Sequence, residues 1–175
     1  MIIHATRKLA ARLPEVSKEP LQEINALGNW HADRLILDRR QCVLFCHDET
    51  RAALFIAGLQ KLQFAALGGD IFRELFADTL AALECPQAQI RRALLSLGPC
   101  GFDAATDRSV LSSMRVARQD LEAYLWNFRN VLMMDPVEAS RRLTRRPVSV
   151  RGKQFWPQDR LLELVAGLEK MESRT

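Results

Sequence analysis

Residues 27–58 read LGNWHADRLILDRRQCVLFCHDETRAALFIAG and contain three strand-like runs separated by short polar breaks. The runs are Arg34–Leu37, Cys42–Cys46 and Ala52–Ile56, each rich in the aliphatic and aromatic side chains that strands favour. The breaks at 38–41 and 47–50 are charged or polar, as turns between neighbouring strands usually are. We therefore predict a three-strand antiparallel meander that ends at Gly58.

The rest of the chain is expected to cover this meander, because a three-stranded sheet persists only when its apolar face is packed against another element. Apolar residues recur at three- and four-residue steps in several segments, which is typical of amphipathic helices. Helices are expected near residues 71–83, 86–97, from 109 onward, from 136 to 143 and from 157 onward. The last of these carries the stripe Leu161, Leu164, Val165, Leu168 and Met171.

Two further strands complete the predicted fold. Ile2 and Ile3 indicate a short N-terminal strand, and residues 102–106 indicate one more near the middle of the chain. We expect a single α+β domain over residues 1–175, with a small, mainly antiparallel sheet covered by four to five helices. The predicted core consists of Trp30, Leu35, Leu37, Val43, Phe45, Phe72, Leu75, Phe76, Leu121, Leu125 and Phe128.

Composition excludes several classes of protein. A chain of 175 residues with 48% hydrophobic content is long enough for one ordinary core. Its longest apolar run, Ala52–Leu59, is far shorter than the roughly 20 residues that span a bilayer, so we expect a cytoplasmic protein without membrane contact. The four cysteines form no CxxC pair and predict buried thiols rather than a zinc site or a disulfide framework.

The positive charge is concentrated late in the chain. Residues 141–153, the basic segment, carry six cations and no carboxylate, and two aromatic residues follow it. Such a mixture is typical of a surface that contacts phosphates, so nucleic acid is a candidate partner. The simpler interpretation is a solvated helix end whose arginines complement the helix dipole. The candidate contacts are Arg141, Arg142, Arg145, Arg146, Arg151 and Lys153.

A second candidate site lies at the predicted start of the helix from residue 109. Ser109 is placed to cap that helix, and the free N–H groups beside Arg108 would form an anion pocket that also includes Ser112. The alternative is that Ser109 only caps the helix and that Arg108 pairs with an internal carboxylate such as Asp48.

The third candidate site consists of Trp30, His31 and Asp48. His31 with a carboxylate nearby suggests acid–base chemistry, but no serine or cysteine nucleophile stands at a recognisable elbow. Packing of Trp30 and a hydrogen-bonded His31 is the favoured interpretation. The spacing of His4, His31 and His47 does not require a metal, so no metal site is predicted. Nucleotide-binding and hydrolase signatures are absent, and no cofactor is predicted.

Two motifs resemble a known family. Trp30-His31-Ala32 before the predicted hairpin, and TDRSVLSSM at residues 106–114, resemble a family of small bacterial proteins classed as a domain of unknown function. The resemblance extends from Met1 to about Pro157. Members of that family usually continue their second motif with Asn-Asp, where this chain has Arg115-Val116, so no role for that pair is expected here. The resemblance supports the fold and implies no activity.

Two functions of different classes remain open at this point. The first is a non-enzymatic binding or regulatory module whose basic segment contacts nucleic acid or another protein. The second is an enzyme that acts on a phosphorylated small molecule or nucleic acid through Arg108, His31 and Asp48. A cleft that joins these three residues would favour the enzyme, whereas their separation into core and surface would favour the module.

Overall fold

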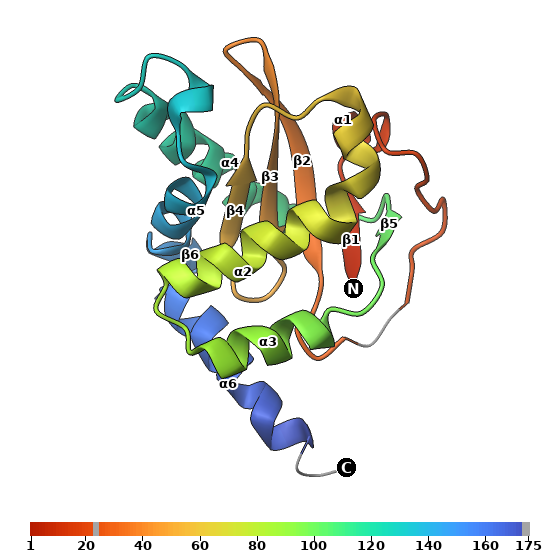
Figure 1. Ribbon diagram of the computed structural model, residues 1–175, viewed down its shortest axis with the longest axis vertical. Coiled ribbons are helices and arrows are strands. Elements are labelled where there is room, and N and C mark those ends of the chain that lie inside the picture. The colour runs from red at the N-terminus through yellow and green to blue at the C-terminus, as the bar shows by residue number, and fades with distance from the viewer. Residues whose placement is uncertain (23–24, 173–175) are drawn as a thin grey trace.

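A computed structural model of the protein describes residues 1–22 and 25–172. In this part of the chain, a five-stranded mixed sheet carries helices on both faces, and a separate two-stranded hairpin lies beside it (Figure 1). The strands are β1 (Ile2–Ala5), β2 (Trp30–Leu37), β3 (Arg40–His47), β4 (Ala53–Ile56), β5 (Gly101–Asp103), β6 (Val148–Val150) and β7 (Lys153–Phe155). The α-helices are α1 (Arg7–Ala10), α2 (Phe72–Ala82), α3 (Gln87–Ser96), α4 (Arg108–Leu125), α5 (Pro136–Thr144) and α6 (Pro157–Glu172). The side chain of Met171 lies outside the described residues.

The predicted meander is confirmed, and its strands are longer than the apolar runs. β2, β3 and β4 pair antiparallel, with Leu37 opposite Arg40 at one end and Trp30 opposite His47 at the other. Asp38 and Arg39 form a two-residue turn in which both residues have positive φ, the conformation that suits the twist of a hairpin.

The expectation of a mainly antiparallel sheet is confirmed, and β1 adds parallel pairs that were not predicted. The strand order is β4-β3-β2-β1-β5, and β1 is parallel to both of its neighbours, so the sheet is mixed. Parallel neighbours require long crossover connections. Residues 6–29 connect β1 to its parallel neighbour β2. The chain reaches the other parallel neighbour, β5, only after the meander and the helices that follow it. The extra strand predicted near 102–106 exists as the shorter β5.

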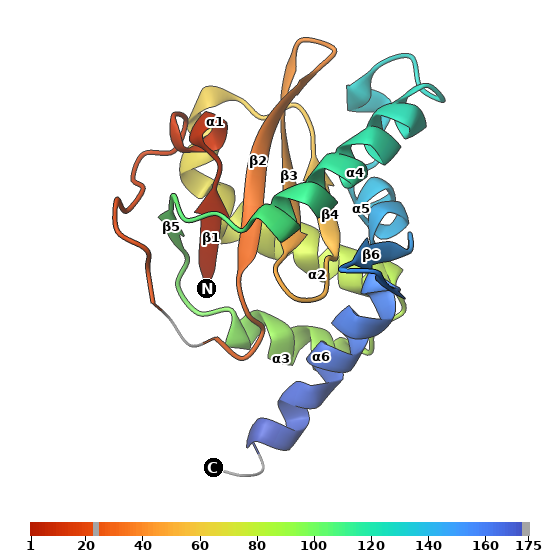
Figure 2. The same cartoon turned by 180° about the vertical axis from the view of Figure 1, so that it is seen from behind.

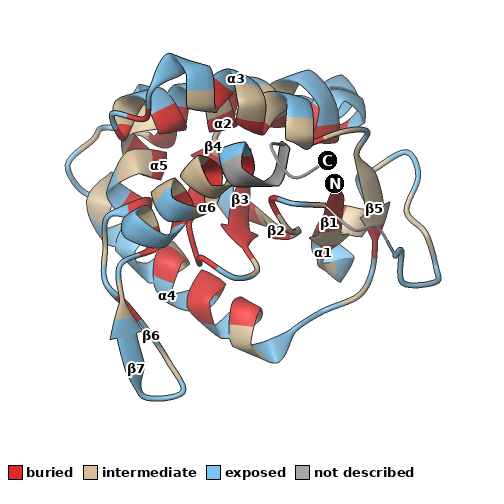
Figure 3. Cartoon of the chain, turned by 90° about the horizontal axis from the view of Figure 1, so that it is seen from below, coloured by how far each residue is buried: buried red, intermediate tan, exposed pale blue. Residues whose placement is uncertain are grey.

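Both faces of the sheet are covered. α2 and α3 lie over one face of the sheet and α4 lies over the other, while α5 runs beside the edge strand β4 and α6 lies against α3 (Figures 1 and 2). The first core lies on the side of α2 and α3 and includes residues of α6, and the second core lies on the side of α4 and includes residues of α5. Buried residues lie between these layers, and exposed residues lie on the outer sides of the helices (Figure 3). The predicted core residues are buried except Leu125 and Phe128, which are partly buried against the second core. None of the helices in the described residues has the length and apolar content needed to cross a bilayer.

Aromatic rings fill the first core. Trp30 meets Phe72 and Phe76 edge to face, with ring centroids 5.1 Å and 5.7 Å apart, and Phe45 meets Phe72 at 5.2 Å. Such pairs add to the free energy gained from burying the rings. The indole of Trp30 therefore has a packing role, as the sequence favoured.

The open edge of β4 is closed by hydroxyl groups of α5. The N–H of Phe55 donates to Ser140 Oγ at 2.9 Å, and the N–H of Ala53 donates to Thr144 Oγ1 at 3.1 Å, which in turn donates to the carbonyl of Ala53 at 3.0 Å. Both hydroxyl residues are fully buried. These bonds satisfy the edge of the sheet and fix α5 against it, since a buried backbone group without a partner is costly.

The start of α5 was correctly predicted. Asp135 caps the helix by accepting from the N–H groups of Val137 and Glu138, and Pro136 occupies the first helical position. Cap and hydroxyl bonds together determine which side of α5 faces the sheet, and hence which side presents its arginines to solvent.

Replacing Thr144 with valine should test this anchor. Valine keeps the shape but leaves the N–H of Ala53 without a partner in a buried place, so we expect the free energy of unfolding to fall by about 1–3 kcal/mol. Urea denaturation measures the change. Thr144→Ser keeps the hydroxyl and is the matched control. Equal stability of the wild type and Thr144→Val would contradict the proposed anchor.

Candidate functional site

Three neighbouring strands place polar side chains in line on one face of the sheet. In the register of β5, β1 and β2, His4 is opposite Asp103 on one side and opposite His31 on the other. The rings of His4 and His31 lie 4.8 Å apart between centroids. We call Asp103, His4 and His31 the polar row.

His31 is buried and has partners at both ring nitrogens. The backbone N–H of Asp107 donates to its Nε2 at 2.9 Å, so the ring proton is on Nδ1, which lies 2.7 Å from Asp48 Oδ1. The proton position follows from this network, because an N–H donor requires a lone pair on the nitrogen it meets. His31 therefore holds Asp48 in place and has no nitrogen left for a substrate.

His4 is the more accessible histidine of the row. Its Nδ1 lies 2.6 Å from Oδ1 of Asp103, a carboxylate with no exposed surface, and its Nε2 lies 3.5 Å from Oδ2 of Asp48. Asp103 also accepts backbone N–H groups from Ala105 and Leu21. His4 thus lies between two carboxylates, and Asp48 connects the row to the surface.

The cap of α4 differs from the prediction. Asp107, not Ser109, is the N-cap, and it accepts from the N–H groups of Ser109 at 2.6 Å and Val110 at 3.1 Å. The hydrogen bond from Val110, together with that from Ser109, lowers the pKa of Asp107. A carboxylate of the protein itself thus occupies the helix end that the sequence offered as a candidate anion pocket.

Arg51 occupies the role that the sequence considered for Arg108. Arg51 is buried, has a positive φ, and donates to the carbonyl of Asp48 and, at 3.0 Å, to Ser109 Oγ. Arg108 is exposed, and among the described residues no ion pair joins it to Asp48. A positive φ in a residue other than glycine is a sign of a constrained site, but sequence alone does not reveal it.

Trp30 and His47 lie apart from the polar row. Successive strand residues point to opposite faces, so the ring of Trp30 packs in the first core while His31 faces the other side. His47 meets Trp30 edge to face, and its Nε2 lies 2.5 Å from the carbonyl of Leu27. Burial lowers the pKa of His47, which keeps the ring neutral. The three histidines therefore do not meet: His4 and His31 are neighbours, and His47 is in the core.

Cys46 continues the row on β3, opposite His31. It is fully buried, and burial raises the pKa of its thiol to about 12. A thiol that stays protonated is a poor nucleophile and a poor metal ligand. Cys46 is thus a packing residue, as predicted for the cysteines.

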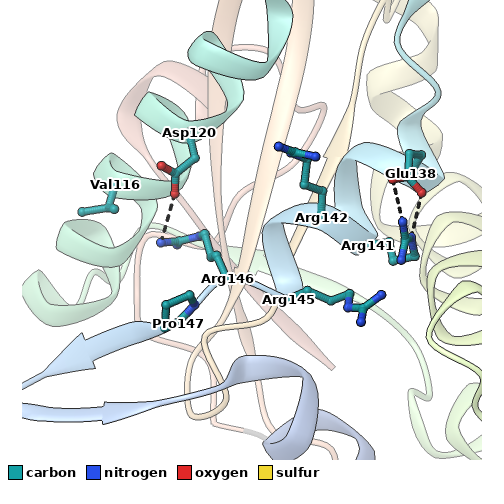
Figure 4. A pocket seen from close by; sticks show the side chains of 8 residues that line it. All are labelled: Val116, Asp120, Glu138, Arg141, Arg142, Arg145, Arg146 and Pro147. Atoms are coloured by element: carbon teal, nitrogen blue, oxygen red, sulfur yellow. Dashed lines mark hydrogen bonds and ion pairs between the residues drawn. The ribbon is translucent and has the colours of Figure 1, made fainter.

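A pocket of about 640 Å³ opens between α4 and α5 at the start of the basic segment (Figure 4). We call it the arginine pocket, and its lining residues are Val116, Asp120, Glu138, Arg141, Arg142, Arg145, Arg146 and Pro147. Arg141 donates two hydrogen bonds, of 2.7 Å and 2.8 Å, to Glu138. This hydrogen bonding to Glu138 raises the pKa of Arg141. Arg146 is 3.5 Å from Asp120 and donates to the carbonyl of Ser113.

The other two arginines of the pocket have no carboxylate partner among the described residues. The guanidinium of Arg142 lies over the ring of Tyr124, 4.7 Å from its centroid, and Arg145 is exposed at the C-terminal cap of α5. In Figure 4 no dashed line reaches either side chain. Stacking on an aromatic face leaves the positive charge of Arg142 intact.

Two further hollows continue from the arginine pocket. The first, of about 360 Å³, shares Arg146 with it and adds Ser109, Ser112 and Arg151. The second, of about 280 Å³, shares Ser109 and Arg151 with the first and ends at Asp48 and Arg51. A line of arginine and serine side chains therefore runs from α5 past the β6–β7 hairpin to the edge of the polar row.

The structure thus brings some predicted residues together and separates others. Ser109, Ser112, Arg146 and Arg151 share one hollow, whereas Arg108 is in none of those described above. Lys153 is exposed on β7. The residues that sequence reasoning missed are Asp103, Asp107 and Arg51, and the β6–β7 hairpin was also missed.

Comparison with known proteins identifies a family that matches most of the chain. A family model described as Domain of unknown function (DUF6933) matches residues 2–160. No curated protein matches the chain. The expected similarity to a family of unknown function is confirmed at this level, and its individual motifs stay predictions.

The cap of α4 yields a prediction that separates Asp107 from Ser109. Asp107→Ala removes the acceptor for two helix N–H groups, so the free energy of unfolding should fall by about 1 kcal/mol in chemical denaturation. Asp107→Asn retains a capping oxygen and should lie close to the wild type. An equal loss with Asn and with Ala would show that Asp107 acts by its charge rather than as a cap.

Proposed function

We propose that this chain, which belongs to the DUF6933 family, is a binding module whose arginine pocket contacts a phosphate-bearing partner. Nucleic acid is the partner that the charge pattern favours. The observation that carries the proposal is the pair Arg142 and Arg145, which line an open pocket with no carboxylate partner in the described residues.

The remaining residues that line the arginine pocket show which of its cations are available to a ligand. Arg141 and Arg146 have their charges offset by Glu138 and Asp120, so they shape the pocket more than they attract a ligand. Burial also lowers the pKa of Arg146, which is half-buried. The cations available to phosphates are Arg142, Arg145, Arg151 and Lys153, which are all exposed.

The shape of the surface fits an extended anion better than a small molecule. The arginine pocket is open, and the neighbouring hollow adds the hydroxyl groups of Ser109, Ser112 and Ser149 next to Arg151. Arginines and hydroxyl groups along a groove are the usual contacts to a nucleic-acid backbone, where they position the chain without reading its sequence. We therefore propose binding with little sequence preference.

The alternative, an enzyme that uses Arg108, His31 and Asp48, has less support. His31 is 2% exposed and both of its nitrogens are engaged, and Arg108 is exposed at the start of α4. A general acid or base must reach the proton that it transfers. Among the described residues, His31 and Asp48 are hydrogen-bonded to each other, but Arg108 has no bond to either residue, and its separation from the pair favours the binding module.

The cytoplasm is the compartment that we propose for this activity. In the part of the chain that the structure describes, no disulfide joins the four cysteines. Free thiols without disulfides are typical of proteins kept in a reducing environment.

The proposal predicts binding to duplex DNA that weakens steeply with salt. If Arg142, Arg145, Arg151 and Lys153 each neutralise one phosphate, the slope of log affinity against log salt should be about −3.6, because each contact adds about −0.9. Mobility-shift titrations across a salt series measure the slope. In the double variant Arg142→Glu and Arg145→Glu, the slope should shrink to about −1.8 and the affinity should fall at every salt concentration.

Arg91→Glu on α3 is the matched control. Arg91 is exposed on the layer that covers the opposite face of the sheet, so reversing its charge should leave the slope unchanged, whereas Arg142→Glu alone, with the same change of net charge, should reduce the slope to about −2.7. No binding by the wild type at low salt would overturn the nucleic-acid proposal. Equal loss in the Arg91 variant would mean that only net charge matters.

A further inference from the structure

The polar row and Asp48 bring metal-binding atoms together at a position that the arginine pocket does not use. One donor atom from each of His4, His31 and Asp48 lies within 4.8 Å of the others. They come from β1, β2 and the turn after β3, so only the folded sheet assembles them. The geometry must then decide which of the three atoms are free to bind an ion.

His4 offers its Nε2. Asp103 is buried and already accepts two backbone N–H groups, so it acts as an acceptor and His4 donates to it from Nδ1. Metal-binding histidines usually hold a carboxylate through their other nitrogen in this way, which orients the ring. The Nε2 lone pair of His4 then points toward Asp48.

Asp48 offers its Oδ2. Its other oxygen accepts the Nδ1–H of His31 at 2.7 Å, and the N–H of Asp107 fixes that tautomer of His31. For His31 to bind an ion through Nδ1, it would have to lose this proton and the bond from Asp107. His31 is therefore a positioning residue for Asp48 rather than a ligand.

The gap between the two remaining donors has the dimensions of a metal site. His4 Nε2 and Asp48 Oδ2 are 3.5 Å apart, and neither atom has another hydrogen-bond partner among the described residues. Two ligand bonds of about 2.1 Å that meet at the tetrahedral angle separate their donor atoms by about 3.4 Å. A divalent cation would bind between them in place of a proton on His4 Nε2.

The surroundings also suit a cation that is reached from solvent. The side chains of His4 and Asp48 are 13% and 25% exposed. Asp48 and Asp103 carry two carboxylates. Arg51, which donates to the backbone carbonyl of Asp48, carries one positive charge nearby. Imidazole together with carboxylate is a ligand set that suits Zn²⁺ and its transition-metal neighbours.

We infer that His4 Nε2 and Asp48 Oδ2 bind one divalent transition-metal ion, with the other coordination positions open to water or a ligand. Asp103 and His31 orient the two ligands. None of its residues lines the arginine pocket, and the nearest proposed phosphate contact is Arg151, which lines the same hollow as Asp48.

Calorimetric titration of the chelator-treated full chain with Zn²⁺, and with Co²⁺ as a spectroscopic probe, tests the inference. We expect one saturable equivalent in the wild type. His4→Gln and Asp48→Asn should each abolish it, whereas His31→Gln should weaken the affinity by about 10–100-fold and retain one equivalent, as loss of an orienting partner does. Circular dichroism verifies that each variant is folded.

Two controls separate this site from incidental binding. Asp33→Asn removes a carboxylate of β2 that bonds Thr6 instead of the polar row, and Cys100→Ser removes the least buried thiol, so both should bind as the wild type does. Absence of saturable binding in the wild type, or unchanged binding in folded His4→Gln and Asp48→Asn, would overturn the inference. Complete loss in folded His31→Gln would overturn the assignment of His31 as a positioning residue.

Discussion

The parallel pairing of β1 with both β2 and β5 is the constraint on which the polar row depends. This register places His4 between Asp103 and His31, and it directs Ile3 into the first core on the other face. Because side chains alternate along a strand, a slip of one residue would exchange these positions. It would bury the His4 ring among aromatic and aliphatic side chains and expose Ile3. Burial of the apolar residues on one face of the sheet therefore determines which polar side chains meet on the other face.

A similar division organises α5 and the surface that it presents. Ser140 and Thr144 face the sheet, where their hydroxyl groups complete the edge of β4, while Arg142 and Arg145 face solvent. One helical period thus produces both the anchor and the charged surface. Glu138 and Asp120 then offset Arg141 and Arg146, so that the unpaired charge is confined to a small part of the basic segment.

Features encoded within a few neighbouring residues could be predicted from the sequence. The meander, the cap of α5 by Asp135 and the aromatic face of α2 follow from alternation, capping and helical period, which act over a few residues. The parallel position of β1 could not be predicted in the same way, because its partners are more than twenty residues away in the sequence and its apolar run is only two residues long.

The residues of the candidate site were harder still to predict from the sequence. His31 and Asp48 were identified from their chemistry, but Asp103 and Arg51 reach them only through strand pairing and a turn with positive φ. Trp30 could have been excluded, because a residue adjacent to His31 on a strand must face the other side. Ser109 was chosen as the cap instead of Asp107, although either residue type can cap a helix. In the structure the cap lies two residues earlier, and the Asp107 carboxylate accepts the helix N–H groups that the candidate anion pocket would have used.

The tautomers of the histidines test the polar row most directly. Long-range ¹H–¹⁵N correlation spectra distinguish a ring proton on Nδ1 from one on Nε2. The hydrogen bonds described above predict the proton of His31 on Nδ1, facing Asp48, and that of His47 on Nε2, facing the carbonyl of Leu27. A His31 proton on Nε2 would contradict the bond from Asp107, and with it the arrangement of β1, β2 and the start of α4 around this site.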